Sequence, residues 1–194
     1  MKIKNYYKQS WKFIKESRNY IYFISILFLI FTTFGFVYPV FFTDIIKNLI
    51  EDIVARTSGL GFFQLFLFIF QNNITTAFTG VIFGVFLGVL PLIFCFFNGY
   101  VLGFVMNKSS EVGFFGVLGR LLPHGIFELP ALAISLGIGL RLGLVYFEKR
   151  KKKEKLGEKV IEVFRNALMV FLLVIIPLLL VAAFIETCLM FVFG

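Results

Sequence analysis

Charged residues are scarce in this chain of 194 residues, at 15% of the total, and it has two cysteines, one histidine and one tryptophan. So little charge excludes an ordinary soluble enzyme and a disordered chain, because both carry far more polar sequence. Two cysteines cannot make a disulfide scaffold, and neither has the spacing of a zinc site. Cys95 and Cys188 lie in apolar runs and are expected to be small buried side chains.

Apolar sequence is what the chain has in excess: 59% of the residues are hydrophobic, 29 are Phe, and the mean hydropathy is +0.93. Each membrane crossing takes about 20 apolar residues. The apolar stretches supply four to six crossings and leave no room for a separate soluble domain. The sequence therefore predicts an all-α fold: a polytopic transmembrane helical bundle with kinked or broken helices, forming one membrane domain over residues 1–194.

Two basic segments set the expected topology in the cell membrane. Residues 1–19 form a basic arm and residues 148–165 a basic loop, and both are expected in the cytoplasm because lysine and arginine favour that side. Residues 44–58 carry both charge signs and form the expected outer loop, with an amphipathic surface helix. No charged residue lies between Arg56 and Lys108, a stretch long enough for two crossings. The expected total is five crossings, the last over residues 167–193, with the carboxyl terminus outside.

The middle of the chain leaves several alternatives open. Gly80, Gly84 and Gly88 recur every four residues, which gives a helix a smooth stripe for close helix contact, either within the chain or in a homodimer. The Asn98-Gly99 pair predicts the turn between the two middle crossings, or else a break within one long helix. Residues 62–71 are expected to be interfacial or re-entrant. Asn72, Asn73 and Asn98 lie in hydrocarbon. Asn73 and Asn98 are expected to form a hydrogen bond between helices, or the asparagines line a water path.

Ionisable side chains within apolar runs cost about 2.5 to 3.5 kcal/mol at the bilayer centre, so each calls for an explanation. Arg120, His124 and Glu128 are four residues apart and would share one helix face. Pro123 and Pro130 predict a helix break beside them. Glu128 and Glu186 each lie roughly 28 Å from the cytoplasmic end of their helices, so these four residues form a candidate polar cluster near the outer face.

The candidate polar cluster has three interpretations. Glu128 pairs with His124 or Arg120 and fixes a helix break; or His124, Glu128 and Glu186 hold a proton or a transition metal such as zinc; or a metal-bound water there performs hydrolysis. No other cofactor is expected. Arg141 lies about 9 Å from its helix end and is expected to reach the headgroups without a partner.

Several motifs together resemble the stage II sporulation protein M family. They are residues 69–73 (IFQNN), Gly84 and Gly88, residues 98–103 (NGYVLG), residues 123–130 (PHGIFELP) and residues 139–143 (GLRLG). The resemblance implies a five-crossing protein that scaffolds a cell-wall-degrading complex at the engulfing septum by holding partner proteins.

The expected function is a non-enzymatic scaffold or assembly component. The alternative is a small transporter, channel or permease subunit with an ion or proton site at His124, Glu128 and Glu186. The expected partners are membrane lipid, other membrane proteins and a second copy of the chain. Nucleic acid is not expected, because the basic loop lacks interleaved aromatic residues.

Overall fold

The computed structural model describes residues 3–147 and 156–193, with the side chains of residues 110–124 outside the description. The described part is entirely helical. Its helices are α1 (Ile3–Glu16), α2 (Arg18–Val37), α3 (Thr43–Thr57), α4 (Phe62–Ile82), α5 (Val89–Leu144), α6 (Leu156–Val170) and α7 (Ile176–Phe193). Short helical turns extend three of them: Phe83–Val85 after α4, Val145–Phe147 after α5, and a π-helical turn, Phe171–Ile175, which joins α6 to α7.

Five segments are long and apolar enough to cross a membrane, which confirms the predicted fold class and the number of crossings. They are Arg18–Val37, Phe62–Val85, Val89–Ser109, Gly125–Phe147 and Leu156–Val192. Residues 62–71, expected to be interfacial or re-entrant, are instead the first half of the spanning helix α4. An apolar run with few breakers propagates as one helix because each added residue gains a backbone hydrogen bond.

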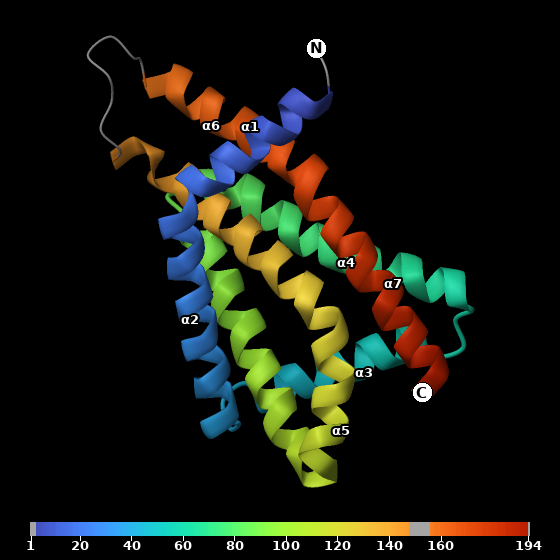
Figure 1. Ribbon diagram of the computed structural model, residues 1–194. Helices are drawn as coiled ribbons and strands as arrows, with labels where there is room; N and C mark the ends of the chain where they lie inside the picture. Colours follow the sequence, from blue (N-terminus) through green and yellow to red (C-terminus); the bar gives the residue numbers. More distant parts are fainter. Residues whose placement is uncertain (1–2, 148–155, 194) are drawn as a thin grey trace.

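Helix α5 contains two of the five crossings. Its 56 residues would reach roughly 84 Å as a straight rod, nearly three times the hydrocarbon thickness. Figure 1 shows that it turns back on itself instead, so that Val89–Ser109 forms a first arm and Gly125–Phe147 an antiparallel second arm. The sequence predicts a break or a kink near Pro123 and Pro130; the backbone is helical through both prolines, and α5 reverses its direction between Ser109 and Gly125.

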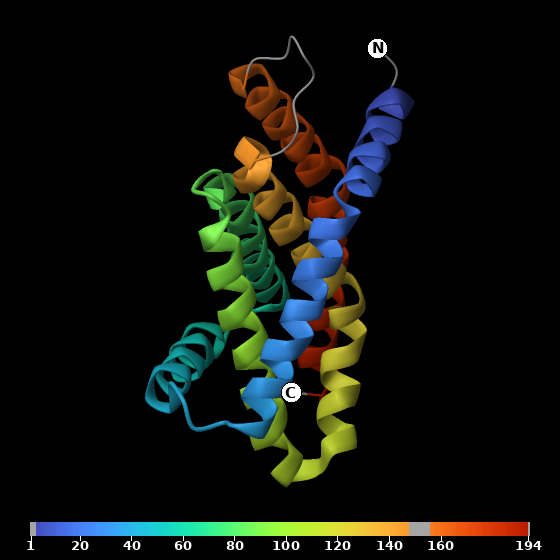
Figure 2. The ribbon, with the colours of Figure 1, turned by 90° about the vertical axis from the view of Figure 1, so that its left-hand side faces the viewer.

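Helix α2 packs between the two arms of α5 (Figure 2). Glycines on both arms allow this close approach: a Cβ added at Gly99 would lie 2.9 Å from the Phe28 carbonyl oxygen, and one at Gly137 would lie 2.7 Å from Ile21 Cα. Gly99 therefore does not make the turn that the Asn98-Gly99 pair predicted. It lies within the first arm and serves as a contact surface for α2.

The turn between the two middle crossings lies at residues 83–88. The helical turn Phe83–Val85 ends α4, and Leu87 and Gly88 then take positive φ angles of 54° and 72°. Gly88 adopts this angle without a Cβ penalty, whereas Leu87 adopts it at a cost. Pro91 follows in the first turn of α5, where a missing N–H breaks no helical hydrogen bond.

The two basic helices meet at one end of the bundle. Helices α1 and α6 lie side by side (Figure 1), and Gln9 Nε2 donates a hydrogen bond to Asn166 Oδ1 at 2.9 Å. The predicted amphipathic surface helix is α3, which lies across the opposite end. The described parts of the two basic segments thus share an end, as the topology requires. Which end faces the cytoplasm stays a prediction.

Candidate functional sites

The candidate polar cluster is only partly visible. Glu128 on the second arm of α5 and Glu186 on α7 are both half-buried, while the side chains of Arg120 and His124 lie outside the description. Among the described residues, no group of three or more His, Cys, Asp and Glu side chains is placed to hold a metal ion. The metal and proton interpretations of this cluster therefore stay predictions.

The asparagines do not pair between helices as expected. Asn98 Nδ2 donates to the Phe94 carbonyl of its own helix at 2.8 Å, and Asn72 Nδ2 lies 3.4 Å from Oδ1 of its neighbour Asn73. Asn98 is one turn away from that carbonyl, so a local bond is easily made. The expected Asn73–Asn98 bond is not among the hydrogen bonds of the described residues, and the amide of Asn98 instead bonds within its own helix.

The glycine stripe packs within the chain. A Cβ at Gly84 would collide with the Gly139 carbonyl, one at Gly139 with the Gly80 carbonyl, and one at Gly143 with the Gly88 nitrogen. We refer to these five residues as the glycine contact. It joins the end of α4 to the second arm of α5 at backbone distance, which only glycine permits. The intramolecular alternative is the one the structure has, and the predicted homodimer face at these positions is already covered.

Arg141 is largely covered by α1 rather than extended toward the headgroups. Its Nη1 donates to Ser17 Oγ at 2.9 Å, its Nη2 lies 3.8 Å from Glu16 Oε2, and its guanidinium lies 4.5 Å from the centre of the Phe13 ring. Only 12% of the side chain is exposed. We define Phe13, Glu16, Ser17 and Arg141 as the elbow cluster, since they lie where α1 meets α2.

The elbow cluster joins the amino-terminal arm to the core. Ser17 is fully buried, donates from Oγ to the Phe13 carbonyl at 2.8 Å, and accepts the bond from Arg141. The prediction that Arg141 needs no partner was wrong. The rise per residue along its helix placed Arg141 near the edge of the membrane. That estimate could not show that α1 packs over this end of α5 and covers the Arg141 side chain.

Tyr100 forms a second anchor, near the other end of the bundle. It is fully buried. Its hydroxyl oxygen lies 2.8 Å from the carbonyl oxygen of Tyr38 and 2.9 Å from that of Phe41. The same oxygen accepts a hydrogen bond from the backbone N–H of Phe41 at 3.0 Å. These three groups belong to the segment that joins α2 to α3. Asn107 Nδ2 donates to the Phe36 carbonyl nearby at 2.9 Å. The first arm of α5 thereby fixes the end of α2 and the start of α3.

Sequence reasoning missed three of these anchors: Tyr100, Asn107 and Ser135. The Ser135 hydroxyl donates to the Ala77 carbonyl across the interface with α4. A tyrosine, an asparagine and a serine in apolar helices are unremarkable by type. Their importance comes from their hydrogen bonds to backbone carbonyls on other elements. These carbonyls lie at helix ends or across a contact between small residues, so their positions depend on the fold.

With this arrangement established, the chain belongs to a known family of membrane proteins. The family described as Stage II sporulation protein M matches residues 24–189. The match includes the five crossings, apart from the first six residues of α2 and the last residues of α7, together with the glycine contact, Arg141 and Tyr100. The predicted resemblance is confirmed, and the chain is a multi-pass membrane protein of this family.

A curated relative covers a smaller part. The chain is 35% identical over 86 residues, 43% of its length, to the uncharacterized protein MJ0706 of Methanocaldococcus jannaschii, and the match spans 37% of that relative's length. No solved structure matches. The family model thus assigns the family, and the helices of the structure define the fold.

Proposed function

We propose that this protein is a non-enzymatic scaffold or assembly component of the membrane, which holds other membrane proteins through its outer helix faces. The observation that carries the proposal is the use made of polar side chains in the spans. Asn98, Asn107, Ser135 and Tyr100 bond to backbone carbonyls, and Arg141 bonds within the elbow cluster. Asn98 bonds within its own helix, whereas the other four groups join different elements, which is what a rigid platform requires.

The outer face of α2 is the surface offered to partners. Ile26, Leu29 and Ile30 are 55–64% exposed along it, next to a shallow apolar hollow of about 480 Å³ that Val37 also lines. In a bilayer such a face meets either lipid or another helix. Family membership supports the scaffold role through the partner-holding activity that the resemblance implies.

The alternative function is a small transporter, channel or permease subunit. The observation that favours it is Glu186, a half-buried carboxylate within the last crossing for which the described residues show no hydrogen bond or ion pair. Carboxylates inside a membrane domain often mark ion or proton pathways. The site would comprise Glu186 with Glu128 and His124.

Neutral substitution separates the two functions. Variants with Glu128→Gln, Glu186→Gln or both substitutions are reconstituted in proteoliposomes, where ion and proton flux is measured. In cells, the same variants are compared for the complexes that a crosslinker at position 30 of α2 captures. A scaffold shows no flux above empty liposomes, and both variants keep the crosslinked complexes of the unsubstituted chain. Flux that the unsubstituted chain supports and either variant loses, while still folding, contradicts the scaffold and supports the transporter.

A further inference from the structure

An apolar groove runs along α2 where it faces both arms of α5. It has a volume of about 580 Å³ and extends on α2 from Ile21 to Thr32, with Leu102 and Met106 of the first arm at its back and Ala133 among its walls on the second arm. Figure 2 shows the two arms on either side of α2. The 11 residue steps from Ile21 to Thr32 correspond to roughly 16 Å of helix, close to one leaflet of hydrocarbon.

The middle of the groove offers no free hydroxyl along α2. The hydroxyls of Ser25 and Thr32 each donate at 2.9 Å to a carbonyl one turn back in the same helix, Ile21 for Ser25 and Phe28 for Thr32. The third hydroxyl on this face belongs to Tyr22, at the end of the groove nearest Arg18. A polar molecule deep in the groove would lose its hydration without gaining partners. The matching occupant is a hydrocarbon chain.

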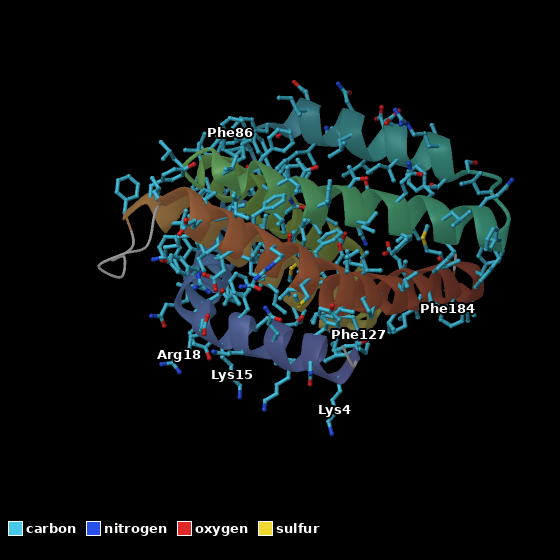
Figure 3. The ribbon with its side chains drawn as sticks, turned by 90° about the horizontal axis from the view of Figure 1, so that it is seen from above. Lys4, Lys15, Arg18, Phe86, Phe127 and Phe184 are labelled. Atoms are coloured by element: carbon cyan, nitrogen blue, oxygen red, sulfur yellow. The ribbon has the colours of Figure 1, made fainter. Side chains whose placement is uncertain are left out.

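One end of the groove is positively charged. Arg18 lies four residues before Tyr22, and Tyr22, Ser25 and Leu29 follow on the same helix face and line the groove. Lys15 and Arg18 are both exposed, and Figure 3 shows them pointing away from the bundle on the same side. The acidic residue between them, Glu16, is paired with Arg141 and, at 4.0 Å, with Lys12. An anionic group at this end therefore meets two bases.

We propose that this groove is a binding site for one anionic phospholipid, with an acyl chain along α2 and the phosphate at Arg18 and Lys15. The charged end favours an anionic lipid over an apolar partner helix, because the phosphate of a lipid supplies a negative charge to Arg18 and Lys15 while its acyl chain fills the apolar groove. The site places a lipid against α2 and both arms of α5 at once, so the lipid stabilises their packing.

Native mass spectrometry of the full chain in detergent tests the charged end. The chain is titrated with phosphatidylglycerol and, separately, with phosphatidylcholine. The doubly substituted Lys15→Gln, Arg18→Gln chain is expected to bind phosphatidylglycerol roughly 30-fold more weakly, because each base near a membrane surface contributes about one factor of five. The matched control is Lys4→Gln, Lys8→Gln, which removes the same charge at the far end of α1. Equal weakening in both double variants, or none in either, overturns the headgroup site.

A filled groove tests the hydrocarbon end. Ala133→Phe places a ring in the groove and is expected to abolish the tight phosphatidylglycerol site; Ser25→Leu is the second variant should the first not fold. Unchanged phosphatidylglycerol affinity in a folded groove-filled variant overturns the proposal. If that variant instead loses a crosslinked membrane protein while keeping the lipid, the groove binds a partner helix and the lipid assignment is wrong.

Discussion

At the residue scale, Arg141 shows how one charge inside an apolar crossing is accommodated. Its guanidinium contacts a hydroxyl, a carboxylate and an aromatic ring, all contributed by α1 and the first residue after it. A charge-assisted hydrogen bond contributes about 1.5 to 3 kcal/mol, and a cation–π contact about 0.5 to 2 kcal/mol. The elbow cluster thus gives the amino-terminal arm a defined position on the bundle.

Arg141→Ala is expected to lower the free energy of unfolding by about 2 to 4 kcal/mol, because it leaves Ser17 without its donor and opens a gap beside Phe13. Glu16→Gln is expected to cost under about 1 kcal/mol, since this carboxylate is half exposed and its pairing distance is long. Denaturant titration in mixed micelles measures both. A larger effect of Glu16→Gln than of Arg141→Ala would contradict the importance given to the serine bond and the ring.

Tyr100→Phe removes one hydroxyl and is expected to cost about 1 to 3 kcal/mol, because the Phe41 N–H and the two carbonyls lose a buried partner. Tyr22→Phe is the matched control: that side chain is 62% exposed, and its change should be near zero. Thermal unfolding of the purified variants gives the comparison. Equal shifts for the two tyrosines would show that the Tyr100 hydroxyl does not hold the α2–α3 connection.

At the scale of elements, the glycine contact decides how α4 meets the second arm of α5. The backbones approach so closely that a single methyl group at Gly84 or Gly139 meets a carbonyl of the other element. Since backbone cannot swing aside as a flexible side chain does, the whole helix must shift. The absence of side chains at the glycine contact therefore sets the short distance between the two helix backbones.

Gly84→Ala and Gly139→Ala are each expected to destabilise the protein by about 1 to 3 kcal/mol or to prevent folding. Gly125→Ala is the control on the same helix, because a Cβ there would come no closer than 3.8 Å to Leu129; it should be neutral or slightly stabilising, as alanine favours helix over glycine. The yield of monodisperse protein and its melting temperature provide the readout. A Gly125→Ala loss as large as that at Gly84 would argue against the close contact.

Some elements of the fold could be predicted from the sequence, and others could not. The amphipathic helix α3, the basic helices α1 and α6, and the five apolar crossings follow from periodicity, charge and length, which are local properties. The turn at Leu87 and Gly88 does not, because a glycine every fourth residue fits both a packing stripe and a turn, and here Gly84 and Gly88 serve in both. The reversal between the two arms of α5 does follow, because the count of five crossings places a separate crossing after Lys108.

The candidate sites divide in the same way. A lone charge in hydrocarbon is visible in sequence, so Glu128, Glu186 and Arg141 could be selected, but the partner of each depends on the packing. The same estimate of helical rise that placed Arg141 at the edge of the membrane could not include the arm that covers it. Tyr100 and Ser135 carry no such signal, since their carbonyl partners lie 59 and 58 residues away.

At the scale of the whole molecule, charge and packing agree on one arrangement. Helices α1 and α6 lie together at one end, α3 lies at the other, and an even number of crossings separates the two basic helices. Tyr100, Asn107, Ser135 and Arg141, between or near these ends, hold different elements to one another. The result is a platform with a basic end, an amphipathic helix at the opposite end, and an outer α2 face open to lipid or partners.

The most direct measurement is side-specific labelling of single cysteines in intact cells, in a chain whose Cys95 and Cys188 have been replaced by alanine. Lys8→Cys on α1, Glu158→Cys on α6 and Ser58→Cys after α3 are all at exposed positions. An impermeant reagent added outside is expected to label position 58 and to leave positions 8 and 158 unlabelled until the membrane is opened. Labelling of position 58 from the same side as position 8 or 158 would contradict the five-crossing arrangement.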